Sequence, residues 1–274
     1  MPFSVEQFLD LFAQYNRAVW PLQLALIVLA GVTVALAFSA RGWASRVVAA
    51  SLSMLWFWAG VVYHWLFFSR INRAAWLFGA LFVAQAVVFL WLGVVKRALQ
   101  FRFSPDRGGL GGLLCLAYAL LLYPLLGQWQ GHLFPRAPSF GTPCPVTIFT
   151  FGMLLWTTGR VRLFVLALPL LWSLIGAAAA FTLGMREDFA LPAAGLFAVV
   201  LLAQRKRNWP QATPLFNEEK NYACERQRRI CAATVARAQP VGGRSLAFVV
   251  SPRTAGRTHR HDIGRHRRHH RLRR

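Results

Sequence analysis

Apolar residues come in long runs along this chain and do not alternate with polar ones, which indicates helices that are buried or face lipid. A helix needs roughly 20 apolar residues to cross a bilayer core. Seven runs approach that length, and two of them are short. They lie at about 20–39, 47–68, 74–95, 110–127, 146–158, 163–183 and 189–203. The pattern therefore predicts an all-α protein, a polytopic transmembrane helical bundle of about seven spans over residues 19–204.

The first 18 residues differ from these runs, because their apolar side chains repeat with helical spacing between polar ones. Ser4 and Gln7 have the spacing of a capping box, in which each side chain bonds the backbone N–H of the other residue. Residues 1–18 are therefore expected to form an amphipathic helix. Its polar face lacks the cations of a strong lipid binder, so the helix either lies on the membrane surface or docks against the protein's own helices.

A proline-rich stretch at residues 138–155, reading PSFGTPCPVTIFTFGMLL, joins the two apolar halves of the chain. Pro143 and Pro145 each lack a backbone donor and restrict the preceding residue, so we expect irregular backbone as far as Val146 and a short span after it. Two interpretations stay open: an ordinary outer loop that caps a short helix, and a polar rim that lines a solute site.

A solute rim at the outer membrane edge would use the polar and ionisable groups that the pattern places there. These candidate rim residues are Cys144, Thr147, Thr150, Glu187 and Asp188. For the two acids, the alternative is an ordinary solvated loop. The sequence thus offers a candidate rim, but the spacing alone does not show that its members meet.

Two histidines, His64 and His132, fall on the same side of the predicted bundle, and a pair of histidines can ligate haem or a metal ion. Against this metal site, placement in an aromatic belt explains His64, which lies between Tyr63 and Trp65. No cofactor is expected.

Other polar positions within the runs have structural interpretations. Gln85 lies near the middle of its run and is expected to bond a neighbouring helix. A stripe of small residues on the sixth run predicts close approach of another helix, more readily within the bundle than in a dimer. The stripe consists of Ser173, Gly176, Ala177, Ala180 and Gly184.

The formal net charge of +22 belongs mostly to the C-terminal part of the chain. Residues 1–203 contain 13 Lys and Arg against 5 Asp and Glu, whereas residues 204–274 contain 18 against 4. Such a composition predicts a disordered, basic tail over residues 205–274. The tail could bind anionic lipid head groups, and less readily nucleic acid. Alternatively, the tail is an out-of-frame or read-through extension, because such extensions can also be rich in Arg and His and lack periodicity.

Cations also predict the orientation, because cytoplasmic loops carry the excess of Lys and Arg. With the N-terminus outside, seven spans place eleven cations on the inner side and five on the outer side. If residues 146–158 formed a re-entrant hairpin, the three cations at 205–207 would fall outside. The count favours seven spans, an outer N-terminus and a cytoplasmic C-terminus.

No nucleotide-phosphate loop, zinc-protease helix, nucleophile elbow or Rossmann glycine pattern occurs in a usable context. No Asp or Glu lies within a predicted span, which weakens the case for a proton- or sodium-coupled carrier. The first hypothesis is a small-solute permease, a channel-like unit or a structural membrane component. The alternative is a membrane-embedded enzyme, or a metal- or haem-binding protein, that acts on lipid or quinone. The sequence does not indicate an oligomeric state.

Three separated blocks carry a resemblance to a known family. They are MPFSVEQFLDLFAQYNRAVWP, TPCPVTIFTFGMLL and PLLWSLIGAAAAFTLGMREDFALPAAGL. Over about residues 1–203 the chain resembles a family of bacterial multi-pass inner-membrane proteins described only as a domain of unknown function. The resemblance implies a helical bundle in the bacterial inner membrane, and it implies no activity or catalytic residue.

Overall fold

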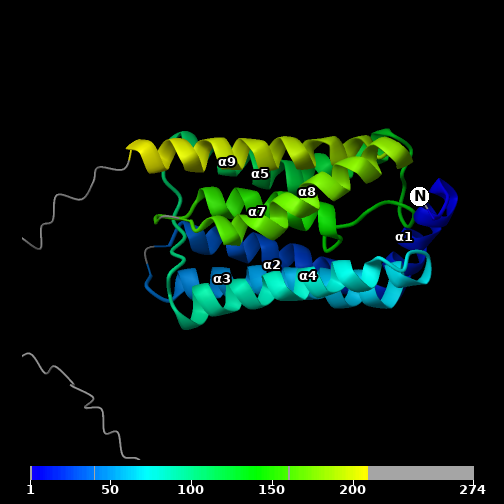
Figure 1. Cartoon of the computed structure of the whole chain (residues 1–274), viewed down its shortest axis with the longest axis horizontal. Coiled ribbons are helices and arrows are strands. Elements are labelled where there is room, and N and C mark those ends of the chain that lie inside the picture. The colour runs from blue at the N-terminus through cyan, green and yellow to red at the C-terminus, as the bar shows by residue number, and fades with distance from the viewer. Residues whose placement is uncertain (1, 40, 160, 209–274) are drawn as a thin grey trace, which may run out of the picture. The chain divides into compact units, whose positions relative to one another are not determined.

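The computed structural model describes residues 2–39, 41–159 and 161–208, with side chains in the last range as far as Arg205. The described chain is all-α, as the apolar runs predict, and each of the seven runs forms a helix (Figure 1). The α-helices are α1 (Val5–Val19), α2 (Leu22–Ala37), α3 (Ala44–Trp58), α4 (Ala75–Phe89), α5 (Arg107–Ala117), α6 (Tyr123–Trp129), α7 (Pro143–Leu155), α8 (Leu163–Leu183) and α9 (Ala190–Asn208).

Several of these helices continue through π-helical or 3-10 turns. The π-helical segments are η1 (Ala59–Phe67), η3 (Leu90–Val95) and η4 (Tyr118–Leu122), and the 3-10 segments are η2 (Phe68–Arg70) and η5 (Arg186–Phe189). Within the described residues, five helices are long and apolar enough to cross a membrane, or six if α1 and α2, bent by 84°, form one broken span. The expected seven spans are therefore only partly matched, because α7 is shorter than these helices.

The short helix α7 lies at the centre of the bundle, between α8 and α9 on one side and α2, α3 and α4 on the other (Figure 1). Every α7 residue except Cys144 is buried. The helix begins at Pro143, so the expectation of irregular backbone up to Val146 is wrong. The first turn of a helix has no intrahelical partner for its N–H groups, so Pro143 and Pro145 remove no helical bond there.

The bundle has two ends, which are held differently. At the end that we call the α1 end, α1 meets the loop before α7 and the π-helical segment η1. At the opposite end, which we call the loop end, the segments around residues 100 and 157 bond each other through their backbones. Arg102 N–H donates to Trp156 O over 2.7 Å, and Thr158 N–H donates to Gln100 O over 2.8 Å.

The amphipathic helix α1 is confirmed, together with its capping box. Ser4 Oγ accepts from Gln7 N–H over 3.2 Å, and Gln7 Oε1 accepts from Ser4 N–H over 2.9 Å. The apolar face of α1 docks on the protein itself, as one of the two alternatives predicted. It forms a second hydrophobic cluster, separate from the main core, with Tyr63 and Phe67 of η1 and Leu183 of α8.

Two predictions about polar and small residues are also confirmed. Gln85 of α4 donates from Nε2 to Val165 O of α8 over 3.0 Å, which links two helices within the core. Gly176 allows α8 to approach α9, because a Cβ at that position would lie 2.5 Å from the side chain of Leu191. The stripe therefore serves packing inside the bundle at Ser173 and Gly176, whereas Gly184 has nothing within 4 Å of its Cβ position and ends α8.

The helix α9 continues to Asn208, past the boundary expected at residue 204. Arg205 Nη1 donates to Thr157 O at the loop end, so this residue belongs to the bundle and not to the tail. The remainder of the expected tail, with Cys224 and Cys231, lies outside the described residues.

Candidate functional site

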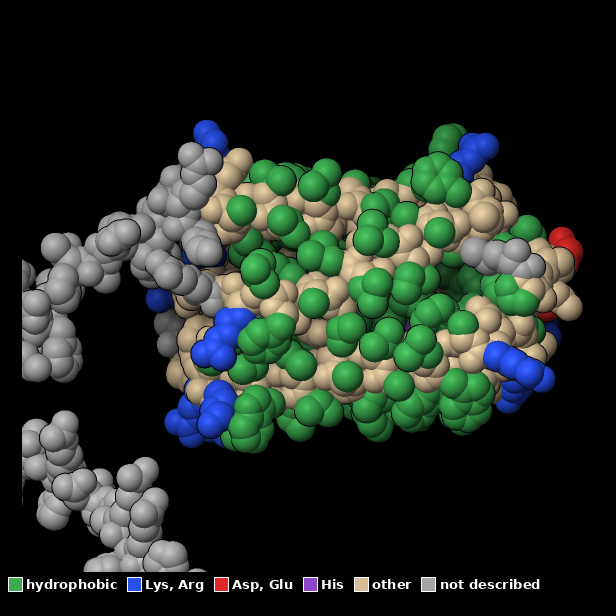
Figure 2. Space-filling model, viewed as in Figure 1, with side chains coloured by type: hydrophobic (Ala, Val, Ile, Leu, Met, Phe, Trp, Pro, Cys, Tyr) green, Lys and Arg blue, Asp and Glu red, His purple; other side chains and the backbone are tan. Residues whose placement is uncertain are grey.

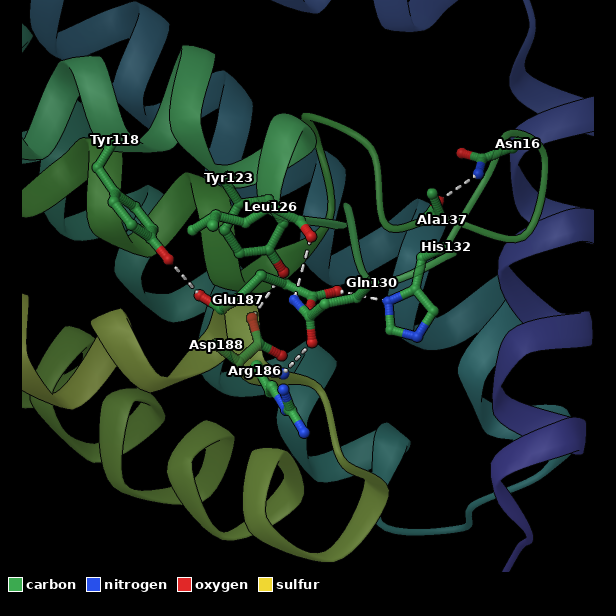
Figure 3. Close-up of polar contacts among 10 residues, drawn as sticks. All are labelled: Asn16, Tyr118, Tyr123, Leu126, Gln130, His132, Ala137, Arg186, Glu187 and Asp188. Atoms are coloured by element: carbon green, nitrogen blue, oxygen red, sulfur yellow. Dashed lines mark hydrogen bonds and ion pairs between the residues drawn. The ribbon is translucent and has the colours of Figure 1, made fainter. Parts of the chain in front are cut away.

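A buried carboxylate, Glu187, joins two segments at the α1 end of the bundle (Figure 3). Its Oε1 lies 3.0 Å from Nδ1 of His132, and its Oε2 accepts from Gln130 Nε2 over 2.9 Å. The side chain of Glu187 is fully buried. Two polar partners in the loop after α6 therefore satisfy a carboxylate that would otherwise be costly to bury.

Local chain geometry explains how this carboxylate turns inward. Gly184 ends α8 in the left-handed conformation with φ +73°, and the chain then enters the tight turn η5. Tyr118 Oη donates to Glu187 O over 2.7 Å, and Arg186 N–H donates to Gln130 Oε1 over 3.2 Å. The segment from α5 to α6 thus holds the turn through both side chains and backbone (Figure 3).

The next residue, Asp188, is also buried and lies beside a second set of groups. Its Oδ1 accepts from Tyr123 Oη over 2.6 Å. The thiol of Cys144, at the start of α7, lies against Asp188 and against the indole of Trp172 in α8. The expectation of a solvated loop at Glu187 and Asp188 is therefore wrong, because both acids are buried and their partners come from segments far away in the sequence.

A cavity of about 320 Å³ opens beside Asp188 under α1. Its walls are mainly aromatic, and Asp188 is the one charged group among the described residues that line it. The aromatic residues are Phe3, Phe8, Phe12, Tyr63, Phe68, Phe78, Tyr123 and Trp172. Trp172 is itself buried, and its Nε1 has no hydrogen-bond partner among the described residues. The site therefore combines an apolar volume with one acidic group and one unpaired donor.

The N-terminal segment covers this cavity. Pro2 and Phe3 contribute to its wall together with α1, and Figure 2 shows the surface hollowed near this end. Asn16 of α1 fixes the cover, because its Nδ2 donates to Pro135 O and Ala137 O over 2.6 and 2.7 Å (Figure 3). On the surface, Arg136 joins Glu6 at 2.5 Å and Asp10 at 2.9 Å. The loop before α7 thus holds α1 over the cavity.

The two candidate metal-binding histidines have different surroundings. His132 pairs with Glu187, whereas His64 is fully buried among the rings of Phe68, Phe82 and Trp172. An aromatic-belt position for His64 is therefore wrong. Neither ring nitrogen of His64 has a hydrogen-bond partner among the described residues. Within those residues, no three His, Cys, Asp or Glu side chains come together to hold a metal ion.

The candidate rim divides into residues at the cavity and residues away from it. Cys144 and Asp188 line the cavity, and Glu187 lies behind them in its own hydrogen-bonded set. Thr147 and Thr150 are fully buried in α7, where their hydroxyls donate to backbone carbonyls one turn earlier. Thr150 Oγ1 also accepts from Trp56 Nε1 over 2.8 Å. The two threonines therefore serve helix packing.

Residues that sequence reasoning missed complete the site. Tyr123, Gln130 and Asn16 supply its hydrogen bonds, and Trp172 supplies its unpaired donor. Each of the four lies within or beside an apolar run. From the sequence alone, a tyrosine or tryptophan at such a position cannot be told from one that anchors the helix at the membrane interface. The one sequence feature that could have pointed to these residues is Asn16, a polar residue on the apolar face of α1.

A second cavity, of about 560 Å³, lies at the loop end between the start of α8 and the end of α9. Aliphatic side chains such as Leu166 and Leu202 form much of its wall, together with Phe164. Its charged lining residues within the described chain are Arg162 and Arg205. This cavity therefore has the opposite charge to the one under α1.

Comparison with known proteins identifies one similarity. The family model described as a family of unknown function, DUF6064, matches residues 5–212. No curated protein and no solved structure gives a significant match to the chain.

Proposed function

The chain belongs to this family of unknown function, and from that premise we propose that it is a multi-pass membrane protein that binds a small amphiphilic molecule in the cavity under α1. The single observation that carries the proposal is that cavity, with aromatic walls and one buried carboxyl, Asp188. Apolar walls with few polar groups are typical of small-molecule sites.

The surface of the bundle supports a membrane location. Large apolar side chains are exposed along the lengths of the helices, for example Val28 of α2, Leu77 of α4 and Leu174 of α8. In Figure 2 apolar side chains cover the middle of the visible face, and Lys and Arg lie at its two ends. The 21 residues of α8 give a length of about 32 Å, which matches a hydrocarbon core of about 30 Å.

Seven spans are supported by the way the chain alternates between the two ends of the bundle. The passes are α2, α3 with η1, α4 with η3, α5 through α6, α7, α8 and α9. Cations at the loop end outnumber those at the α1 end among the described residues, which favours a cytoplasmic loop end and an outer N-terminus. The loop-end cations are Arg41, Arg46, Lys96, Arg97, Arg102, Arg107, Arg162 and Arg205, and those at the α1 end are Arg17, Arg70, Arg73, Arg136 and Arg186. By the family resemblance, the membrane is the bacterial inner membrane.

The packing of α7 argues against a channel-like unit. A pore along the bundle would run where α7 stands, and the positions that it would line are filled by buried side chains such as Phe149, Phe151 and Met153. The cavity lies above one end of this helix, at Cys144, and not along it. Binding at one end is therefore better supported than passage through the centre.

A second candidate function is an enzyme that acts on a lipid or a quinone. One observation favours it, namely that Asp188, Tyr123 and Cys144 meet on one wall of the cavity. A carboxyl, a phenol and a thiol can move protons, but the described lining residues include no His or Lys that could activate the thiol as a nucleophile. Binding without chemistry therefore explains the site with fewer assumptions.

Photolabelling tests the proposed function. The protein is reconstituted in lipid nanodiscs and exposed to three medium-chain alkyl diazirines that end in an amine, an alcohol or a carboxylic acid. With at least one of them, mass spectrometry should find adducts on Phe3, Phe68 or Cys144, which line the cavity from three different segments. Absence of adducts on all three residues with every probe would contradict the proposal.

A matched pair of variants provides the control. Ala179 lines the cavity and Ala178 beside it is exposed, so Ala179→Phe should fill the cavity while Ala178→Phe adds the same ring outside. Labelling of the lining residues should fall several-fold in the first variant and stay unchanged in the second. Equal labelling in both variants would mean that the probes reach these residues from the surrounding lipid.

A further inference from the structure

Resting on the proposed function, we infer that the ligand of the cavity under α1 is an amphiphilic organic cation, an amine or quaternary ammonium group with an apolar tail. Three observations lead to this class: the sign of the charge in the cavity, the aromatic side chains of its walls and the buried donor of Trp172.

The charge is the first observation. Asp188 is the one charged side chain among the described lining residues, and no Lys or Arg faces it across the cavity. The nearby Glu187, just outside the lining, adds a second carboxyl that is paired with His132. Burial without a nearby cation disfavours the ionised form of Asp188, which the hydroxyl of Tyr123 hydrogen-bonds, so a ligand cation that stabilises this form gains more here than an uncharged group of the same shape.

The aromatic walls are the second observation. The face of an aromatic ring attracts a cation within about 6 Å, most strongly for tryptophan, and quaternary ammonium ligands are commonly held in such cages. Tyr63, Phe78 and Trp172 line the cavity together, and Trp172 packs edge-to-face on Phe78 with ring centroids 5.5 Å apart. The same aromatic rings can pack against an alkyl tail, so the aromatic wall suits both the cationic group and the apolar tail of the ligand.

The unpaired donor is the third observation, and it is independent of the acids. Trp172 Nε1 is buried, and its polar neighbour is the sulfur of Cys144, a weak acceptor that does not satisfy the donor at hydrogen-bond geometry. A buried N–H without an acceptor costs stability, and an oxygen of the ligand would remove that cost. A cation with an oxygen a few bonds away, as in a choline or ethanolamine ester, therefore satisfies Asp188 and Trp172 together.

A pair of isosteric esters tests the charge requirement. Octanoylcholine and 3,3-dimethylbutyl octanoate have the same shape and ester oxygen, and they differ in a nitrogen that carries charge against an uncharged carbon. Binding to the full chain in nanodiscs is measured by competition with the alkyl diazirine that labels the cavity. The wild type should bind the choline ester at least about tenfold more tightly, and Asp188→Asn should reduce that ratio to near one.

The control variant is Asp10→Asn, which removes an exposed carboxylate outside the cavity and should retain the wild-type ratio. Equal binding of both esters by the wild type would overturn the cation inference and leave the proposed function intact. Failure of both esters and of all diazirines would remove the proposed function as well. A retained ratio in Asp188→Asn would show that Asp188 is not the charge that selects the ligand.

A second measurement needs no substitution at Asp188, in case that variant does not fold. Cys144 lines the cavity, so its modification by small methanethiosulfonates reports the charge there, and peptide mapping separates it from the other cysteines. A trimethylammonium reagent should react several-fold faster than a sulfonate reagent of similar size, and octanoylcholine should slow it. A faster sulfonate reaction would overturn the inference.

Discussion

The two ends of the bundle are held together by different groups. At the α1 end, buried side chains make the links, such as Asn16 to the loop carbonyls and Glu187 to His132 and Gln130. At the loop end, backbone groups bond each other directly, and glycines allow the chains to touch. Both ends enclose a cavity, so the difference teaches that buried side-chain links surround the space under α1, whereas direct backbone contacts join the segments at the loop end.

The cavities at the two ends also differ, in the sign of their charged lining residues. The one under α1 combines aromatic rings with Asp188, and the one at the loop end combines mainly aliphatic side chains with Arg162 and Arg205. Because backbone contacts link the loop end and side chains link the α1 end, substitutions that disturb a backbone contact should lower stability most at the loop end. Substitutions of polar side chains should lower stability at the α1 end.

The largest expected effect is that of Gly109→Ala at the loop end. A Cβ at this position would lie 1.6 Å from Ser104 O, and a backbone oxygen cannot move aside as a flexible side chain can. We expect destabilisation at or above about 3 kcal/mol, the upper part of the range for overpacking, measured by thermal or denaturant unfolding in nanodiscs. Gly42→Ala is the control, because nothing lies within 4 Å of its Cβ position. Comparable stability of the two variants would contradict the close contact.

A smaller effect is expected from Asn16→Ala at the α1 end. The substitution leaves Pro135 O and Ala137 O without their donor and removes the acceptor of Ser139 Oγ. These groups are only partly buried and water can replace part of the lost bonds, so the total cost should be about 2 kcal/mol, within the roughly 1–3 kcal/mol that one fully buried unpaired group costs. Labelling of Phe3 by the alkyl diazirines should also change, because α1 covers the cavity.

The control for this helix is Gln14→Ala, which alters an exposed position and should stay within about 0.5 kcal/mol of the wild type. If Asn16→Ala were equally mild, the side-chain link between α1 and the loop would not hold the cover in place.

The smallest expected effect concerns pH at the loop end. Asp106 caps α5 by accepting from Gly109 N–H over 2.7 Å. Burial alone would raise the pKa of Asp106, but the hydrogen bonds from Gly109 and Ser104 and the charge of Arg205 together lower it. A lowered carboxyl pKa stabilises the fold above the unfolded value of about 3.9 and ceases to do so as pH falls through the folded value.

Asp106→Asn keeps the cap but removes this titration. Near pH 7 the variant should be less stable by about 0.5 kcal/mol, the scale of a carboxylate at a helix N-terminus. The difference from the wild type should begin to shrink as pH falls to about 3.9 and should vanish only below the lower folded pKa, where the aspartate of the folded protein is protonated. Unfolding curves at neutral and acidic pH provide the measurement, and a difference that persists in acid would assign the effect to the cap and not to the charge.

The helices could be predicted from the sequence, because the length of an apolar run and the spacing of Ser4 and Gln7 depend on local chain properties. The link made by Gln85 was predictable for a similar reason, since a lone amide in an apolar run needs a partner. Five or six described helices are long and apolar enough to span a membrane, so seven spans stay a prediction, and run length does not show that α7 is enclosed by other helices.

Cys144, Glu187 and Asp188 could be named from the sequence as rim candidates, but the contacts of the site could not be predicted, because they join distant parts of the chain. Glu187 bonds Gln130 and His132, which are 57 and 55 positions away, and Asp188 bonds Tyr123 at 65 positions. Charged residues between two apolar runs are typical of a loop, and only the three-dimensional packing shows that these two acids point inward. The cavity is hidden in the sequence for the same reason, since its aromatic walls are typical of membrane helices in general.

The central position of α7 has a consequence for the order in which the protein is made. The 13 residues of this helix give about 20 Å, less than the bilayer core, and its neighbours α8 and α9 are synthesised after it. During translation, α7 therefore emerges before the helices that will enclose it. We expect it to remain beside α5 and the insertion machinery until α9 arrives, so that a nascent chain ending before Ala190 is a substrate for membrane quality control.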